Sequence, residues 1–306
     1  MKNICLMMMA AVVLMTACEK AVFDEQLAER QQVKDVSFNL STDDGWTVTR
    51  AGNGTATSAV TMADNGTVTM DVTRTLYANT TPLTDLFMYD CVGGDVNQAQ
   101  HLTSDFDMPS MMLDYGDHAV KFVASRGASP VENDTEHTIV FERPSDTFWA
   151  SKAFEVTDGS SETVDVELSR VVTKLRVNVT DQVPSGISRI VVAPATWYLG
   201  VNYLTAEPCA ASNDGLSVAV PSSYAGTTGQ LMLSIFGFSG ASEWTTAVTI
   251  TAYDSVDEVI GSVTVANVPL LRNRTTDLTG PLFSGSGKAF NISIDDEWST
   301  PVSIDW

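Results

Sequence analysis

Alternation of apolar and polar residues is the dominant pattern along this chain of 306 residues. Apolar side chains at every second position place one face of a strand on a core and the other face in water. The pattern occurs at Val36–Leu40, Val68–Val72, Val164–Leu168, Leu175–Val179, Val248–Ile250 and Val263–Val265. Turn sequences rich in Gly, Asn and Asp lie between these segments. The sequence therefore predicts an all-β chain built from β-sandwiches.

The first 17 residues have the layout of a secretory signal. Lys2 precedes an apolar run that ends at Met15, which is too short to span a bilayer as a stable helix. Thr16 and Ala17 are small residues directly before Cys18, an arrangement that resembles the bacterial lipoprotein signal. Met15 stands where that signal usually has Leu. An alternative interpretation is that Cys18 merely ends the apolar run.

The lipoprotein resemblance implies that Cys18 is acylated and becomes the mature N-terminus. A lipid at Cys18 would hold the protein at the outer membrane without a transmembrane helix. After processing, Cys91 and Cys209 remain as thiols. They are far apart in the sequence, and we expect both to be buried and free rather than joined in a disulfide.

The chain is strongly acidic, with a formal net charge of −21. Removal of the signal takes away Lys2 and makes the charge one unit more negative. Such a body is repelled by phosphate backbones and by anionic lipid surfaces. The charge therefore argues against nucleic acid as a partner.

Three groups of segments, in their order along the chain, carry a resemblance to one protein family. They are Leu113–His118 with Val120–Ala124, Leu168–Val177 followed by Asp181–Pro184, and Asn273–Gly280 with Ile292–Trp298. They resemble, in that order, the end of the first domain, the start of the second domain and the closing part of fimbrillin-like proteins of Bacteroidetes. Each segment alone is a weak signal, and the order of the segments carries the resemblance.

The resemblance implies two tandem transthyretin-like β-sandwich domains after a lipoprotein signal peptide. The predicted division is a signal peptide at 1–17, a tether at 18–35, an N-terminal sandwich at 36–168 and a C-terminal sandwich at 169–306. The length that remains after processing suits two domains. The resemblance further implies export to the cell surface and assembly with other fimbrial subunits into fimbriae that support adhesion. A host protein or glycan ligand is an additional partner consistent with such a role.

Polymerising members of this family are similar in losing their first strand to an arginine-specific protease, after which a neighbour's strand fills the groove. Here Val36, Phe38 and Leu40 would form the removable strand. Arg50 follows it in a turn-rich segment where a protease can reach extended backbone. Arg30 is the alternative, but cleavage there would leave the strand in place. Without cleavage at Arg50, the protein would be a membrane-retained anchor or accessory subunit.

A donor strand must alternate, because its backbone pairs with a strand edge while every second side chain enters the groove. The last residues place Val302, Ile304 and Trp306 on one face, so this segment is the predicted donor strand. Phe290–Ile294 alternates in the same way. The alternative interpretation is that both segments are ordinary core strands of the second domain.

Signs of catalytic chemistry are weak. His101, His118 and His137 have no spacing that makes a metal pair, and no nucleophile or phosphate-loop motif is present. We therefore expect no enzyme activity, no cofactor and no catalytic metal. Two alternatives stay open: calcium binding by Asp295–Glu297 or by Asp114 with Asp117, and stacking of sugar rings on Trp197, Tyr198 or Trp244. The second alternative would make the protein a glycan-binding surface lipoprotein.

Overall fold

The computed structural model describes residues 33–42, 83–106, 108–159, 163–240, 242–284 and 289–295. These residues form strands and a single 3-10 helix, η1 (Ser222–Tyr224), with no α-helix among them. The predicted all-β class is confirmed. The predicted strands at 36–40, 164–168, 175–179, 248–250 and 263–265 lie within β1, β9, β10, β16 and β17, whereas 68–72 lies outside the described residues.

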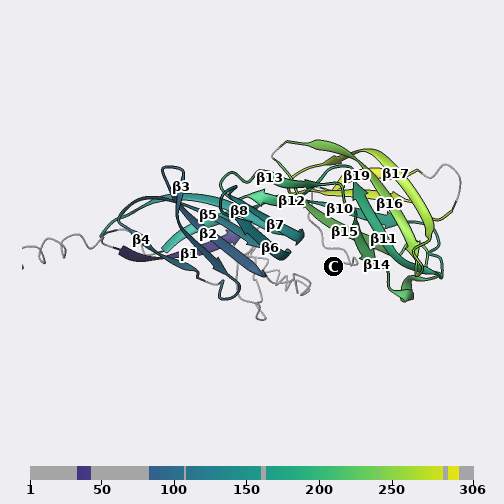
Figure 1. The fold of residues 1–306 in the computed structure, drawn as a ribbon, viewed down its shortest axis with the longest axis horizontal. Coiled ribbons are helices and arrows are strands. Elements are labelled where there is room, and N and C mark those ends of the chain that lie inside the picture. Colours follow the sequence, from purple (N-terminus) through teal and green to yellow (C-terminus); the bar gives the residue numbers. More distant parts are fainter. Residues whose placement is uncertain are drawn as a thin grey trace, which may run out of the picture.

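The first half of the chain contains one seven-stranded sheet in the order β3-β2-β5-β8-β9-β1-β4 (Figure 1). Its strands are β1 (Val33–Thr42), β2 (Asp85–Val92), β3 (Asp95–Leu102), β4 (Ser110–Asp114), β5 (Gly116–Ser125), β8 (Thr147–Val156) and β9 (Thr163–Arg170). Side chains from both ends of this order, such as Leu86 on β2 and Met111 on β4, belong to one buried cluster. The sheet therefore curves around its own core, as a sandwich does.

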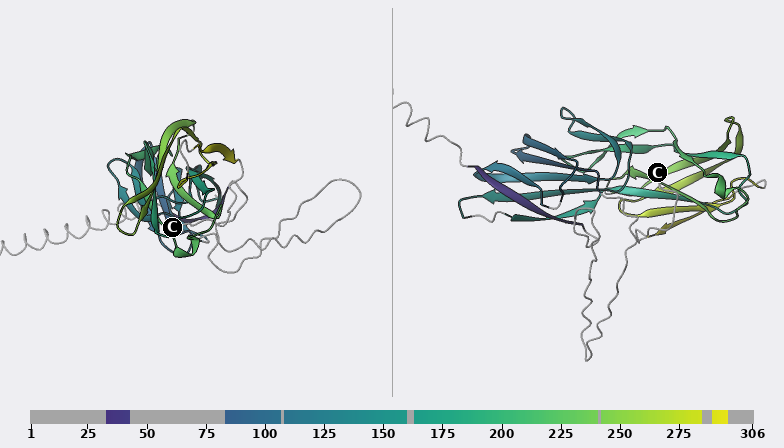
Figure 2. Two further views of the ribbon diagram at one scale, coloured as in Figure 1. Left: turned by 90° about the vertical axis from the view of Figure 1, so that its right-hand side faces the viewer. Right: turned by 90° about the horizontal axis from the view of Figure 1, so that it is seen from below.

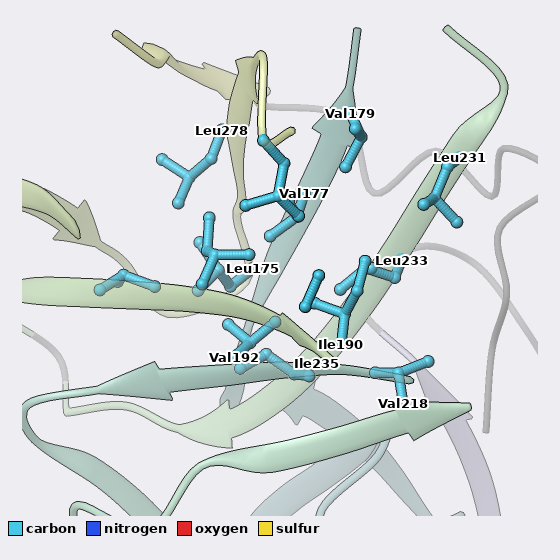
Figure 3. Packing of buried hydrophobic residues seen from close by; sticks show 14 of the residues in the cluster. Leu175, Val177, Val179, Ile190, Val192, Val218, Leu231, Leu233, Ile235 and Leu278 are labelled. Carbon is cyan, nitrogen blue, oxygen red and sulfur yellow. The ribbon is translucent and has the colours of Figure 1, made fainter. Parts of the chain in front are cut away.

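The second half is a sandwich of two four-stranded sheets, in the orders β15-β10-β18-β19 and β14-β11-β16-β17. Its strands are β10 (Val172–Val179), β11 (Ile187–Pro194), β14 (Leu216–Ala219), β15 (Leu231–Phe238), β16 (Trp244–Asp254), β17 (Val259–Leu270), β18 (Thr275–Gly280) and β19 (Asn291–Asp295). Figure 3 shows Leu175 and Val177 of one sheet near Ile190 and Val192 of the other. Burial of these branched side chains between the layers supplies the main stabilisation.

A fourth sheet joins the two halves, in the order β13-β12-β7-β6. It pairs the hairpin β6 (Ala128–Asn133) and β7 (Thr138–Arg143) with the hairpin β12 (Trp197–Asn202) and β13 (Pro208–Ser212). A separate apolar cluster at the junction contains side chains from both halves, including Phe87, Phe141 and Phe238. Figures 1 and 2 show the two halves lying end to end along the long axis with this sheet between them.

Polar contacts reinforce this junction. The ring of Tyr89 stacks on that of Tyr203 with centroids 3.8 Å apart. Trp149 Nε1 donates to the carbonyl oxygen of Tyr203 at 2.8 Å. Arg170 donates to the carboxylate of Asp146 at 2.5 Å and to the side-chain oxygen of Asn273 at 2.8 Å. The junction therefore combines apolar burial with charged hydrogen bonds.

The change from the first half to the second falls at Val171, between β9 and β10. These two strands belong to different sheets. The predicted division at 168 and 169 lies three residues earlier and stays a prediction. The shared sheet shows that the halves, whatever their boundary, are not connected by a free linker.

Cys91 and Cys209 are free thiols near this junction, as the sequence predicts. Cys91 is buried, and burial raises the pKa of its thiol, although nearby Lys121 partly opposes the rise. Cys209 is half-buried, and burial together with Glu136 raises its pKa to about 11. Neither thiol is therefore activated as a nucleophile. In the described part of the chain, no helix has the length and apolarity needed to cross a membrane.

Asp181 fixes the turn after β18 by accepting hydrogen bonds from three consecutive backbone N–H groups. Those of Leu282, Phe283 and Ser284 donate to its carboxylate at 3.0, 2.8 and 2.6 Å, and the Ser284 hydroxyl adds a fourth bond at 2.9 Å. Burial, the largest single influence, raises the pKa of Asp181, but the hydrogen bonds together outweigh it and hold the pKa below its ordinary value of 3.8.

We expect Asp181→Asn to lower the free energy of unfolding by about 1–2 kcal/mol at neutral pH, because hydrogen bonds to a charged acceptor are the stronger ones. A depressed pKa stabilises the fold above the unfolded-state value of 3.8, and this contribution is lost as the pH falls through the folded-state pKa. Urea unfolding at a series of pH values would measure it. A difference between wild type and variant that does not shrink in acid would contradict this account.

Candidate strand-complementation groove

Strand β1 has an unusual place in the first sheet. It lies between β9 and β4, pairing parallel with β9 and antiparallel with β4. Every other pair in that sheet is antiparallel. In the sequence, β1 is separated from β9 by more than a hundred residues. The strand is therefore inserted into a sheet whose other members come from a later, continuous part of the chain.

Alternate side chains of β1 fill the core of the first half. Val36, Phe38 and Leu40 have exposed fractions of 1%, 0% and 1%, whereas Asn39 between them is exposed. The Phe38 ring packs edge-on against Phe122 at a centroid distance of 5.1 Å. The three apolar residues that the sequence predicts as a strand face are thus the ones that enter the core.

Hydrogen bonds hold both edges of β1. The backbone N–H of Phe38 donates to the carbonyl oxygen of Pro109 at 2.8 Å, next to β4. On the outer face, Asn39 Nδ2 donates to the carboxylate of Asp165 on β9 at 2.9 Å. The register pairs Phe38 with Val164 and Val36 with Met111. Backbone pairing on two sides and side-chain burial on one face are what a complementing strand supplies.

Removal of β1 would leave an open groove between β9 and β4. Its walls would carry the unpaired backbone of both strands, and its floor would expose core residues such as Leu113, Phe122 and Val166. Burial of three apolar side chains contributes about 5–8 kcal/mol before ordering costs. An empty groove of this kind is unfavourable in water, because its apolar side chains are exposed and its backbone groups lose their partners.

The predicted processing sites fall beyond the described residues. Cys18, Arg30 and Arg50 precede or follow β1 in the parts of the chain that the structure does not describe, and so does the predicted donor strand with Val302, Ile304 and Trp306. Their roles stay predictions. The bounds of β1, Val33–Thr42, place the whole strand between Arg30 and Arg50 in sequence. A cut after Arg50 would therefore release the strand, whereas a cut after Arg30 would not.

The other alternating segment forms β19, an edge strand that pairs antiparallel with β18. Its two isoleucines, Ile292 and Ile294, have exposed fractions of 39% and 41%. The alternative prediction of an ordinary core strand is therefore wrong for these two side chains. Exposed apolar residues on a strand edge are a feature of surfaces that associate.

Trp197 cannot serve as the sugar platform that the alternative interpretation gave it. Its exposed fraction is 1%, and Nε1 donates to the carbonyl oxygen of Phe236 at 2.9 Å. The ring lies directly over Gly237, where an added Cβ would come within 2.3 Å of it. Trp244 packs against the same core. The sequence shows a tryptophan at this position, but it does not show that the core of the second half buries the side chain.

Metal binding gains no support from the described residues. None of their His, Cys, Asp and Glu side chains form a group of three or more placed to hold an ion. Asp114 and Asp117, the residues of one alternative calcium site, are among the described residues and belong to no such group. In the other alternative, Asp295 ends β19, but Asp296 and Glu297 lie outside the described residues.

Sequence reasoning missed one polar constellation, the pair of His118 on β5 and Asp90 on β2. His118 Nδ1 lies 2.9 Å from Asp90 Oδ1, and the two side chains are 6% and 4% exposed. They are 28 positions apart, with no recognisable spacing. Only the antiparallel register of β2 and β5 brings them together.

The described chain is thus an all-β protein of stacked sheets with an inserted N-terminal strand. Residues 129–305 match the model of a family of unknown function, DUF6562, and the chain belongs to that family. No curated protein matches.

Solved structures with a similar overall arrangement come from Bacteroidales. A candidate cell adhesion protein from Bacteroides ovatus has 13% identity and a TM-score of 0.48, with 89% of this chain and 100% of that chain covered. A candidate polysaccharide binding protein (DUF1812) from Bacteroides thetaiotaomicron has 8% sequence identity and a TM-score of 0.49, with 86% of this chain and 96% of that chain covered. A fimbrial assembly protein from Parabacteroides distasonis has 11% sequence identity and a TM-score of 0.44, with 86% of this chain and 99% of that chain covered. At these scores no functional conclusion follows from the likeness.

Proposed function

We propose that this protein is a structural subunit of surface fimbriae, exported as a lipoprotein through Cys18 and assembled by exchange of β-strands between subunits. In this proposal an arginine-specific cut after Arg50 releases β1, and the strand of another subunit takes its place. The partners are other fimbrial subunits and, before processing, the outer membrane. The protein has no enzymatic role in this proposal.

The observation that carries the proposal is the placement of β1. The strand is paired on both edges and buries Val36, Phe38 and Leu40, yet it is connected to its sheet only through a long segment that contains Arg50. A strand so placed can be released by one cut that leaves the chain from β2 to β9 uncleaved, and its removal opens the sheet between β9 and β4. Exposed Ile292 and Ile294 on the edge strand β19 add a surface suited to association near the C-terminus.

Cleavage of the purified chain with an arginine-specific protease tests this function. We expect a product that begins at Ala51, loses residues up to Arg50 with β1, and forms oligomers that resist heating in detergent. N-terminal sequencing and denaturing electrophoresis measure both steps. Arg50→Lys removes this cleavage site while keeping the charge. Because Arg74 is a second arginine between β1 and β2, the variant that should remain monomeric combines Arg50→Lys with Arg74→Lys.

Arg30→Lys is the matched control, and it should assemble like the wild type because a cut at 30 leaves β1 in place. A chain that ends at Pro301 tests the donor segment and should be cleaved but not elongate. Cleavage at Arg50 followed by a stable monomer would count against polymerisation. Protein recovered from cells with lipidated Cys18 and an intact Arg50 would favour the alternative role of membrane-retained anchor.

A further inference from the structure

A cleft of about 590 Å³ opens at one mouth of the first sheet, between β2, β3, β4 and β5. It lies where the sheet's two end strands, β3 and β4, approach each other across the core. The mouths of β-barrels and sandwiches are frequent binding places, and sites for small molecules have volumes of about 300–1,000 Å³. This cleft borders the groove that holds β1, because both include strand β4 and its residue Leu113.

Polar groups held by the fold line the inner part of the cleft. The side chains of Asp90 and His118 are 4% and 6% exposed, and His118 Nδ1 lies 2.9 Å from Asp90 Oδ1. His118 Nε2 also donates to the carbonyl oxygen of Asp114 at 2.8 Å, so the ring is fixed on both sides. The register pairs Gln98 on β3 with Asp90, which places both side chains on the same face of the sheet. Buried polar groups next to an open cleft are oriented before any ligand arrives.

The outer part of the cleft combines an aromatic ring with flexible apolar and acidic side chains. Tyr115, in the tight turn between β4 and β5, is 37% exposed, and its hydroxyl donates to Asp158 Oδ1 at 3.3 Å. Met112 on β4 is 52% exposed. Asp114 and Asp117 also line the cleft. The Tyr115 hydroxyl bond restrains the ring, which leaves an aromatic surface at the entrance.

The set of lining groups narrows the ligand class. Carboxylates, amides and an imidazole offer both donors and acceptors at short spacing, which suits neighbouring hydroxyl groups. An aromatic ring suits the apolar C–H face of a pyranose. Within the described part of the chain, no Lys or Arg lines the cleft, so phosphate, sulfate and uronic acid groups would face the carboxylates of Asp90, Asp114 and Asp117.

We propose that this cleft binds an uncharged saccharide, with Tyr115 against the sugar ring and Gln98 with the Asp90–His118 pair on its hydroxyls. The site is distinct from Trp197, which is buried in the other half. The proposal does not depend on strand exchange, because the cleft exists in the monomer.

Saturation-transfer NMR on the full chain tests the site, with lactose, maltose, mannobiose and chitobiose as neutral probes at millimolar concentration. Sialyllactose and glucuronic acid serve as anionic probes. We expect transfer to at least one neutral probe and none to the anionic ones. Tyr115→Ala should weaken binding of that probe by about tenfold or more, whereas Tyr115→Phe keeps the ring and should bind nearly as well.

Tyr253→Ala is the matched control, because Tyr253 is a partly buried tyrosine of the second half that stacks with Arg189 and is remote from the cleft. It should bind like the wild type. Circular dichroism and thermal unfolding of each variant separate loss of the site from loss of the fold. Absence of transfer to every neutral probe, equal transfer to anionic probes, or binding unchanged in a folded Tyr115→Ala protein would overturn the proposal.

Discussion

Replacement of Phe38 by alanine is expected to lower the free energy of unfolding by about 3–5 kcal/mol, because the ring is fully buried and packs against Phe122 and Phe154. The same change should weaken the hold of the first sheet on β1. After cleavage at Arg50, release of the strand should be favoured by a factor on the order of 100 or more, since each 1.4 kcal/mol is tenfold. Urea unfolding measures the first effect, and gel filtration of the cleaved chain measures the second.

Asn39→Ala is the control on the same strand. Asn39 is exposed and makes one side-chain hydrogen bond, to Asp165, so its loss should cost about 1 kcal/mol or less. If Phe38→Ala does not fold, Phe38→Leu keeps most of the volume and should show a smaller shift in the same direction. Equal effects of the Phe38 and Asn39 variants would contradict the view that side-chain burial retains β1.

Loss of the Asp146 carboxylate should have an effect of similar size at the junction. Asp146 accepts hydrogen bonds from Arg170 at 2.5 Å and from Arg126 at 2.8 Å, and Arg170 is only 4% exposed. Asp146→Asn removes a negative charge that faces both Arg126 and the buried Arg170, which should cost about 3 kcal/mol. Chemical unfolding at neutral pH measures this cost.

Asp257→Asn is the matched comparison, because Asp257 pairs with Arg189 at the surface, where its side chain is 77% exposed. Asn tolerates the positive backbone angle that Asp257 adopts. Exposed pairs contribute about 0–1 kcal/mol. Variants with indistinguishable unfolding curves would show that the Arg170 charge is compensated by its other contacts, and the junction argument would fail.

Most strands that the sequence pattern predicts correctly have a core on one face and water on the other. Val36–Leu40 is an example, because buried Val36, Phe38 and Leu40 alternate with Ser37 and Asn39. The same holds for Val164–Leu168 in β9, where only alternate residues are fully buried. In such strands apolar residues recur at every second position because successive side chains point to opposite faces and only one face is buried. Strand β10 differs, because Arg176, between Leu175 and Val177, is buried in an ion pair with Asp277.

Strand β2 is a case in which the alternating pattern is absent. Its sequence from Asp85 to Cys91 is buried at every position, because Leu86 and Met88 face the core of the first sheet while Phe87 and Tyr89 face the junction cluster. A strand buried on both faces has no alternation to detect. The second face of β2 is buried only because residues of the distant β12–β13 hairpin, such as Val201 and Tyr203, pack against it.

Long-range pairing accounts for the other features that the sequence does not predict. β7 pairs with β12, and Asp90 meets His118, through registers that no local pattern specifies. The interpretation of Trp197 as a surface residue was wrong for the same reason, since its burial depends on Gly237 and on strands far away in the chain. The sequence predicts Val36–Leu40 as a strand from its own residues, but not its pairing with β9 and β4.

The sheet that β7 and β12 share determines how the fimbria proposed above would respond to flow. Two domains tethered by a loop swivel freely, whereas a large apolar contact suppresses that motion. Here Gly200 approaches Ile139 so closely that a Cβ added to Gly200 would lie 2.6 Å from the carbonyl oxygen of Ile139. The two strands are therefore tightly packed at the junction. Each subunit would then behave as a stiff segment, and the whole appendage would flex only where one molecule meets the next.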